Sequence, residues 1–298
     1  MPVIECVPNF SEGRKKERVM AIVDAANSVQ GVKVADFSMD GDHNRSVLTL
    51  MGPPEAIVSA ALAASEQAVA LIDMREQRGA HPRIGAVDVV PFIPLRNASM
   101  QDAVDAAHRF GREFAERTGV PVYFYGEAAL VPERKVLADI RRGEYENLAG
   151  RLSDPAGFPD AGPVHFNPRT GATSVGARKP LVAFNVNLDT DSVEAARAIA
   201  RAIRYSSGGL DHVQAIGIRL ADRGIVQVSM NLTNCEATPI AVVFDAIQKQ
   251  ANALGVDILE SELVGLMPEA ALAGTTAEHC CIRDFSDNRL IEYHLRNM

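Results

Sequence analysis

The chain contains the stretch GAVDVVPFIPL at Gly85–Leu95 and a related stretch, GVDILESELVGL, at Gly255–Leu266. Each opens with a glycine and continues in a run rich in Val, Ile and Leu, which is typical of a β-strand. A second matching pair precedes them, GPPEAIV at Gly52–Val58 and ATPIAVV at Ala237–Val243, and in both a proline opens an apolar helix. The same helix–strand unit therefore occurs twice, which predicts a duplicated fold.

Working outward from these pairs, the hydrophobic pattern predicts the order β-α-β-β-α-β in each half. Strands are expected at 4–8, 32–37, 46–51, 86–92, 181–188, 213–220, 225–232 and 256–264, and helices at 15–29, 55–74, 192–205 and 238–254. This order forms an antiparallel four-stranded sheet with both helices on one face. We therefore predict an α+β chain of two ferredoxin-like subdomains, residues 1–178 and 179–298, with a ligand cleft between them. Many unrelated chains share this order, so it carries no function by itself.

An insertion, residues 96–179, separates the two repeats. Its pattern predicts helices at 100–118, 132–142 and 144–151 and a strand at 120–125. The segment 153–173 is rich in proline and glycine, which disfavours regular structure. Because it also carries aromatic and basic side chains, we predict a ligand-binding loop there and not a bare linker.

Composition narrows the class of protein. With 47% hydrophobic and 23% charged residues the chain is an ordinary soluble globular protein, and its net charge of −8 argues against general nucleic-acid binding. We see no apolar run of membrane-spanning length and no secretory signal at the start. The cysteines Cys6, Cys235, Cys280 and Cys281 form no CxxC pair, so reduced thiols and a cytoplasmic location are expected. Exposed sheet faces often pair, which favours a homodimer.

Several cofactor motifs are absent. No phosphate-binding GxxxxGK[ST] loop, no GxGxxG after a strand, no HEXXH and no GxSxG occurs, so we expect neither a bound nucleotide nor a metal. Asp40, Asp42 and His43 could together bind a cation. A polar hairpin turn is the favoured interpretation, because Asp and Asn are the usual residues of such turns.

The segment RGAHPR at Arg78–Arg83 carries the strongest candidate for catalysis. Pro82 disfavours helical geometry at the residue before it, so we expect His81 at a loop–strand junction between Arg78 and Arg83. Two neighbouring cations should lower the pKa of the imidazole and keep it neutral near pH 7, as a proton acceptor requires. The alternative is a loop histidine that only hydrogen-bonds its neighbours.

Longer motifs run through the chain in order. They are VPNFSEGR at Val7–Arg14, DHNRSV at Asp42–Val47, GPPEA at Gly52–Ala56, LIDM at Leu71–Met74, HPRIGAVDVVPFIP at His81–Pro94, VPVYFYGEAA at Val120–Ala129, RRGEYENL at Arg141–Leu148, GATSVGARKPLVAFNVNL at Gly171–Leu188 and RLIEYHL at Arg289–Leu295. With these motifs the chain resembles the formiminotransferase (glutamate formimidoyltransferase) domain over nearly its whole length.

The resemblance implies transfer of a formimidoyl group between N5 of tetrahydrofolate and the amine of L-glutamate, a late step of histidine degradation. Tetrahydrofolate would be a co-substrate, with no metal and no nucleotide. The family fold implied is two ferredoxin-like subdomains with folate in a tunnel between them. We expect the cyclodeaminase domain found in animal relatives to be missing.

The resemblance also implies site residues. The HPR motif makes His81 the catalytic general acid and base. The folate-contacting segment corresponds to Gly162, Pro163, Val164, His165, Phe166, Asn167, Pro168, Arg169, Thr170 and Gly171. Carboxylates of the substrates need cations, and Arg45, Arg83 and Arg178 are candidates because a guanidinium binds a carboxylate through two hydrogen bonds.

Two other functions stay open at this point. One is formyl transfer involving 5-formyltetrahydrofolate, although the missing nucleotide loop argues against an ATP-linked cyclisation. The other is a folate-binding or folate-sensing protein without chemistry. A titrating His81 between proline and arginine favours an enzyme, since a protein that only binds needs no such group there.

Overall fold

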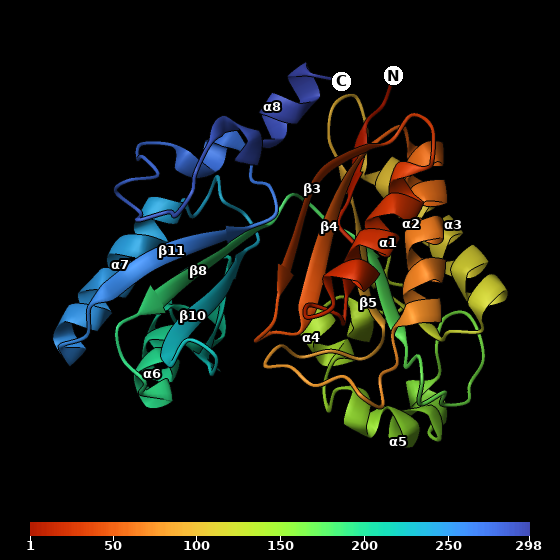
Figure 1. Cartoon of the computed structure of the whole chain (residues 1–298), viewed down its shortest axis with the longest axis horizontal. Coiled ribbons are helices and arrows are strands. Elements are labelled where there is room, and N and C mark those ends of the chain that lie inside the picture. The colour runs from red at the N-terminus through yellow and green to blue at the C-terminus, as the bar shows by residue number, and fades with distance from the viewer. The chain divides into compact units, whose positions relative to one another are not determined.

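The computed structural model describes the whole chain, Met1–Met298, as two compact units, Met1–Arg178 and Lys179–Met298. Each unit has its own β-sheet, of seven strands in the first and four in the second (Figure 1). The prediction of a mixed α and β chain with two sheets is therefore confirmed.

The first unit is built on a mixed sheet. Its strands are β1 (Ile4–Cys6), β2 (Asn9–Phe10), β3 (Lys33–Asp40), β4 (Arg45–Gly52), β5 (Val87–Pro94), β6 (Val122–Gly126) and β7 (Thr173–Ala177). The short strands β1 and β2 both pair with β4 on one side and with β5 on the other. Antiparallel pairing joins β3 to β4, whereas β7 lies parallel to both β5 and β6. The predicted hairpin and fourth strand are therefore part of a larger sheet, in which β4 and β5 are interior strands and β3 is an edge strand that pairs only with β4.

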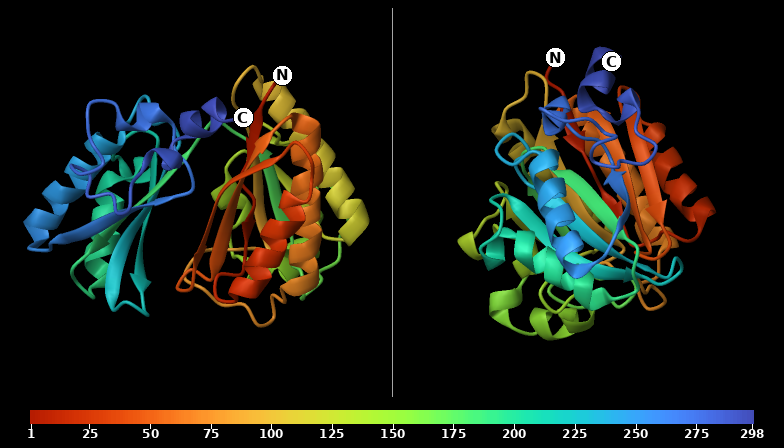
Figure 2. Two further views of the ribbon diagram at one scale, coloured as in Figure 1. Left: turned by 45° about the horizontal axis from the view of Figure 1, so that its top comes forward. Right: turned by 90° about the vertical axis from the view of Figure 1, so that its left-hand side faces the viewer.

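Three helices cover one face of this sheet. They are α1 (Lys16–Asn27), α2 (Pro54–Leu71) and α3 (Met100–Thr118), which lie along one side of the sheet in Figure 1 and in the left view of Figure 2. Side chains alternate between the two faces of a strand. Ile4 and Cys6 of β1 join the core under the helices, so Glu5 between them points to the other face.

The insertion departs from its prediction after α3. Helix α3 has the predicted bounds, with a capping box between Ser99 and Asp102 at its start and Gly119 in left-handed geometry at its end. The predicted helices at 132–142 and 144–151 are instead broken into short pieces. These are η1 (Pro132–Arg134), α4 (Leu137–Ile140), η2 (Tyr145–Asn147), α5 (Leu148–Leu152) and η3 (Pro155–Gly157).

Strand β7 was not predicted. Its sequence, TSVGA, has small side chains and no clear alternation, because all five residues are buried. A parallel strand buried on both faces lacks the period-two pattern on which strand prediction depends. This strand continues the chain directly from the proline-rich segment and pairs it with β5.

The second unit is a simpler repeat of the same order. Its elements are β8 (Val182–Leu188), α6 (Val193–Ile203), η4 (Tyr205–Ser207), β9 (Val213–Leu220), β10 (Ile225–Leu232), α7 (Ile240–Leu254), β11 (Ile258–Val264), η5 (Glu269–Leu272), η6 (Asp287–Arg289) and α8 (Ile291–Arg296). The four strands are antiparallel in the order β11-β8-β10-β9. Val182, Phe184, Val186 and Leu188 of β8 point into the hydrophobic core with helices α6 and α7.

Two further observations concern the chain as a whole. No helix combines the length and the apolar character needed to cross a membrane. All four cysteines are free thiols, three of them buried and Cys281 exposed.

Packing of α6 against β9 depends on Gly217. A Cβ atom at this position would lie 2.3 Å from the backbone nitrogen of Arg197 in α6. We expect Gly217→Ala to lower the free energy of unfolding by about 2–3 kcal/mol, because a backbone cannot yield as a flexible side chain can. Urea unfolding measures the change. The exposed β9 variant Gln214→Ala should differ from wild type by less than about 0.5 kcal/mol; equal losses in both variants would show that the close contact is unimportant.

Candidate functional site

His81 lies in the loop that joins α2 to β5. Its Nδ1 is 2.8 Å from the carbonyl oxygen of Pro82. A carbonyl oxygen only accepts hydrogen bonds, so this contact requires the proton of the neutral ring on Nδ1. The lone pair of the ring is then on Nε2, which is the nitrogen able to take a proton from a substrate.

The environment keeps His81 neutral. Burial of the ring lowers the pKa of His81 well below its ordinary value, and the charges of Arg45 and Arg141 lower it further. The pKa of His81 is therefore lowered as predicted, but the cause of the shift was predicted wrongly. The cations responsible are Arg45 and Arg141, not the sequence neighbours Arg78 and Arg83.

Asp88 organises the charges beside His81. This fully buried carboxylate in β5 accepts hydrogen bonds from Arg45 Nη1 at 2.7 Å, from the backbone N–H of Ile84 at 2.9 Å and from Arg141. Arg45 also donates from Nε to Asn9 Oδ1 at 3.0 Å. One carboxylate thus joins β4, β5, the insertion and the end of the His81 loop.

The cluster of Asp88, Arg45 and Arg141 carries a net positive charge. Burial alone would raise the pKa of Asp88, but the charges of Arg141 and Arg45 outweigh it and bring that pKa to about 2. Asp88 is therefore ionised and balances one of the two guanidinium charges. The remaining positive charge, in surroundings of low dielectric constant, suits the carboxylate of a substrate.

The turn between β3 and β4 holds the His81 loop in place. Asn44 donates from Nδ2 to the carbonyl of Arg78 at 3.0 Å, and the N–H of Ala80 donates to the carbonyl of Asp42 at 3.0 Å. Gly79 is required here, because a Cβ atom would lie 2.0 Å from the carbonyl oxygen of His43. The His43 and His81 rings are 6.0 Å apart between centroids.

The same turn was the candidate cation site. The backbone N–H of His43 donates to Asp40 Oδ1 at 2.7 Å, and His43 Nδ1 is 2.9 Å from that oxygen. The favoured interpretation as a polar hairpin turn is confirmed. Nowhere in the chain do three or more His, Cys, Asp or Glu side chains form a group able to hold a metal ion.

Arg83 lies apart from the His81 ring. Its guanidinium donates to Glu146 at 2.7 and 2.8 Å and to Glu144 at 3.2 Å. It borders an open depression of about 410 Å³ that Arg78 and these two glutamates also line. Its predicted role toward a substrate carboxylate stays a prediction, since a ligand would have to compete with two carboxylates of the chain.

The segment Gly162–Gly171 is a loop whose far end lies beside the His81 loop. The N–H of Ala86 donates to the carbonyl of Thr170 at 2.9 Å, and Gly171 forms a β-bridge with Gly85. Glycine is required at position 171, because its φ is +68° and a Cβ atom there would lie 2.2 Å from the carbonyl oxygen of Ile84. The structure therefore brings together the two segments that the resemblance singled out.

Inside this loop the side chains have distinct surroundings. Val164 and His165 are exposed, whereas Phe166 packs against Tyr145 with ring centroids 5.5 Å apart. Arg169 donates from Nη2 to the carbonyl of Ala70 at 2.6 Å. Exposed apolar and imidazole groups remain for a ligand, while Arg169 anchors the loop to the end of α2.

Tyr145 is a residue that the sequence analysis did not assign. Its N–H donates to the carbonyl of Arg83 at 2.9 Å, and its hydroxyl donates to the carbonyl of Pro168 at 2.5 Å. It therefore links the segment after His81 to the Gly162–Gly171 loop. Its place in the motif RRGEYENL, together with Arg141, was the only sequence feature that pointed to it.

Arg178 follows β7 on the same sheet, and its charge acts on Glu5 and Tyr125. Its backbone N–H donates to the carbonyl of Phe92 at 3.1 Å. Burial raises the pKa of Glu5 to about 7 even though the charge of Arg178 lowers it. Burial likewise raises the pKa of Tyr125, against the charges of Arg178 and Arg141. Tyr125 thus connects the Arg178 group to the cluster around Asp88.

We expect Asp88→Asn to destabilise the first unit by about 3–5 kcal/mol, because it leaves two buried guanidiniums without their carboxylate. In wild type the contribution of Asp88 is present above about pH 4 and is lost as the pH falls toward 2, since folding lowers its pKa. Urea unfolding at pH 7 and pH 3 should show the wild-type advantage shrinking with acid. Asp24→Asn, an exposed change on α1, is the control and should match wild type; an equally stable Asp88→Asn variant would refute the structural role.

Comparison with known proteins supplies the family. The model of the formiminotransferase domain, N-terminal subdomain, matches residues 3–178, and the model of the formiminotransferase domain matches residues 183–292. A glutamate formimidoyltransferase of Streptococcus pyogenes is 40% identical over 98% of this chain and 98% of its own. One from Thermoplasma acidophilum is 43% identical over 98% of this chain and 97% of its own.

A longer relative matches through part of its length. The formimidoyltransferase-cyclodeaminase of Rattus norvegicus is 44% identical over 93% of this chain and 52% of its own. Since family models match both units and relatives of 40% identity or more align over nearly the whole length, the resemblance is confirmed and the chain belongs to the formiminotransferase family.

Proposed function

We propose that the protein is a glutamate formimidoyltransferase, which moves the formimidoyl group between N5 of tetrahydrofolate and the amine of L-glutamate. Two full-length relatives carry that name. The observation that carries the proposal is the neutral His81 ring, with its Nδ1 held by the Pro82 carbonyl and two guanidiniums beside it. A protein that only binds folate has no need of this arrangement.

His81 can transfer one proton in each direction during the reaction. N5 of tetrahydrofolate attacks the formimidoyl carbon of N-formimidoylglutamate, and a C–N bond forms as His81 Nε2 accepts the N5 proton. The bond from that carbon to the glutamate nitrogen then breaks, and the imidazolium returns the proton to the departing nitrogen. The ring ends neutral, so no oxidant, metal or nucleotide is consumed. Acid–base catalysis of this kind contributes about 10²–10⁴-fold.

A lowered pKa suits this double role. It keeps the ring unprotonated before the reaction and makes the imidazolium a strong acid once formed. Asp88 acts in the opposite sense, because its charge raises the pKa of His81. The charge of Asp88 thus partly stabilises the imidazolium, whereas the charges of Arg45 and Arg141 favour its return to the neutral ring.

The substrates need further contacts. We assign a glutamate carboxylate to the positive group of Arg45 and Arg141, and tetrahydrofolate to the exposed side of the Gly162–Gly171 loop, where Phe166 offers an apolar ring. Roles for Arg83 and Arg178 remain predictions. Positioning two substrates in one orientation supplies most of the remaining rate enhancement.

The finer architecture is part of the same proposal. The strand order β11-β8-β10-β9 of the second unit and the corresponding order β5-β1-β4-β3 of the first unit support a duplicated ferredoxin-like fold. The ligand cleft, the division of roles between residues 1–178 and 179–298, the homodimer and the cytoplasmic location stay predictions.

We expect His81→Ala to fold normally and to lose at least tenfold in transfer rate, because it removes the general base. The assay mixes the protein with tetrahydrofolate and N-formimidoylglutamate, acidifies the mixture and follows the absorbance of methenyltetrahydrofolate. His279→Ala, an exposed histidine of the second unit, is the matched control and should keep full activity. Near-wild-type turnover by His81→Ala would exclude the assignment. Formation of N-formylglutamate by wild type from 5-formyltetrahydrofolate and L-glutamate would favour formyl transfer.

We also expect saturating tetrahydrofolate to slow amide hydrogen exchange in residues 162–168, where few backbone groups are hydrogen-bonded, at least severalfold. Hydrogen exchange with mass spectrometry measures it. The exposed turn 205–209 of the second unit serves as the internal control and should exchange at the same rate with and without folate. Unchanged exchange in both segments at saturation would count against a folate-binding role for the loop.

A further inference from the structure

Two histidines of the first unit, His43 and His81, line one small cavity. Its volume is about 10 Å³, and its walls are otherwise polar as well. The centroids of the two imidazole rings are 6.0 Å apart, and the ring planes are tilted by 46°. A cavity of this volume holds one water molecule when polar groups surround it. The two rings are therefore placed to exchange a proton through a single water.

Backbone contacts fix the distance between the two rings. The N–H of Ala80 donates to the carbonyl of Asp42 at 3.0 Å, one residue before each histidine. Gly79 approaches the carbonyl oxygen of His43 so closely that a Cβ atom would lie 2.0 Å from it. Because these contacts join two backbones, the pairing of the rings does not depend on flexible side chains.

The surroundings of the two rings carry opposite charges. His43 Nδ1 lies 2.9 Å from Asp40 Oδ1, which also accepts from the backbone N–H of His43 at 2.7 Å. Burial alone would raise the pKa of Asp40, but the hydrogen bonds and charge of His43 bring that pKa below its ordinary value, so Asp40 is ionised. His81 is instead buried beside the cations Arg45 and Arg141. Such a contrast between neighbouring titratable groups indicates separate roles, one carrying a proton and the other accepting it.

The other charged groups around this turn are mostly cations. They are Asp42, which precedes His43, and the arginines Arg14, Arg45, Arg78 and Arg83. Asp40 is the carboxylate in contact with the His43 ring, and its own side chain is 44% exposed. A proton can therefore pass between His43 and solvent on the Asp40 side of the turn.

The proposed reaction takes up a second proton that His81 alone does not supply. In the mechanism above, His81 carries the N5 proton to the departing nitrogen, and glutamate is formed as a neutral amine. An α-amine has a pKa above 7, so at neutral pH it takes up one further proton and becomes an ammonium. In the opposite direction this proton has to leave before the amine can attack. The site therefore needs a route for one proton between the amine and solvent.

We propose that His43 exchanges this second proton with solvent and passes it to His81 through one water molecule in the shared cavity. The inference rests on the proposed function, which supplies the amine. The His43 imidazolium gives a proton to the water, the water gives one to His81, and His81 gives it to the glutamate nitrogen. His43 then recovers a proton from solvent, so the net change is one proton moved from solvent to the amine. His43 touches no reacting atom and acts through His81.

The variant His43→Asn tests this route in the full-length protein. The amide Nδ2 of asparagine can keep the contact that Nδ1 makes with Asp40, but an amide does not carry a proton between groups. We expect kcat for transfer to fall at least fivefold while KM for both substrates stays within twofold. His212→Asn is the matched control, an exposed histidine with φ of +62°, a geometry that asparagine tolerates, and should keep full activity.

The pH dependence of the reverse direction separates a proton route from a structural role. Transfer from 5-formimidoyltetrahydrofolate to L-glutamate is measured at pH 7 and pH 9. Burial lowers the pKa of His81 well below its ordinary value, so this ring is neutral at both pH values. At pH 9 more of the glutamate arrives as free amine and needs no second proton acceptor. The fivefold gap between wild type and His43→Asn should therefore shrink to less than twofold.

A second measurement does not depend on activity. Nitrogen-15 NMR of protein labelled in its histidines follows the exchange of the His81 ring proton with solvent in the absence of substrates. His43→Asn should slow this exchange at least fivefold, and His212→Asn should leave it unchanged. Asp40→Asn keeps an oxygen for the backbone N–H of His43 but removes the charge, and should slow the exchange severalfold. Asp40→Asn decides the question if His43→Asn does not fold.

The outcomes separate this proposal from the transferase activity. Unchanged ring-proton exchange in His43→Asn and Asp40→Asn overturns the proton route even if transfer by wild type is normal. A loss of kcat in His43→Asn that is equal at pH 7 and pH 9 also overturns it, because a structural role is then sufficient. Lack of transfer by wild type, with exchange at His81 that both variants slow, overturns the activity and supports the route.

Discussion

The buried carboxylate of Asp88 is the constraint on which the first unit depends. It accepts from two guanidiniums and from the backbone of Ile84, so β4, β5, the insertion and the His81 loop all meet at one side chain. A carboxylate without surface can stay ionised only when such partners surround it. The protein thereby fixes a loop to a sheet through charge where apolar contacts alone would leave the loop free to move.

That same cluster determines the chemistry available at His81. Burial lowers the pKa of His81, and the charges of Arg45 and Arg141, only partly offset by Asp88, lower it further, so the imidazole is neutral. The bond to the Pro82 carbonyl then selects the tautomer with a free Nε2. The ion pairs that hold the loop therefore also contribute, after burial of the ring, to the lowered pKa of its histidine.

The sequence predicted what depends on local pattern. The repeated helix–strand units, the bounds of α3, the turn at Asp40–His43 and the family were predicted correctly. Strand β7 was missed because a strand buried on both faces shows no alternation. The cations beside His81 were misassigned because Arg45 and Arg141 are far from it in sequence and come near it only in the folded chain. Neighbours in sequence suggested Arg83, whose charge instead serves two glutamates.

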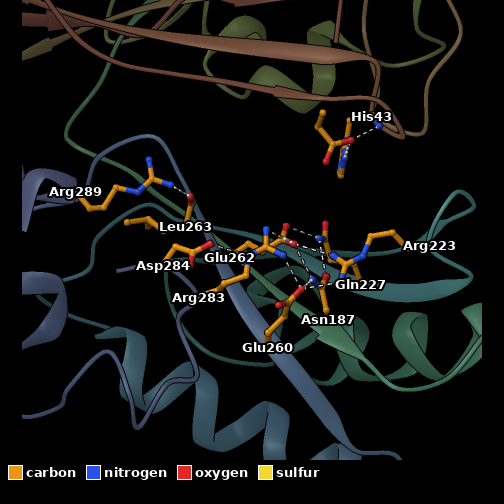
Figure 3. A network of polar contacts seen from close by, with 11 residues as sticks. His43, Asn187, Arg223, Gln227, Glu260, Glu262, Leu263, Arg283, Asp284 and Arg289 are labelled. Atoms are coloured by element: carbon orange, nitrogen blue, oxygen red, sulfur yellow. Dashed lines mark hydrogen bonds and ion pairs between the residues drawn. The ribbon is translucent and has the colours of Figure 1, made fainter. Parts of the chain in front are cut away.

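The two sheets differ in how the face opposite their helices is covered. Each has helices on one face and must satisfy the other face. The first unit buries much of that face under its insertion, with Val89, Tyr123 and Tyr125 in a small apolar cluster. The second unit has no such insertion and covers the face with the amides of Asn187 and Gln227 and with ion pairs that join Arg223 and Arg283 to Glu260 and Glu262 (Figure 3). Asn187 and Gln227 have no exposed surface, and their amide groups donate to the Asn187 oxygen or to Glu260 and Glu262, so side chains of the same sheet satisfy the donors that this face buries.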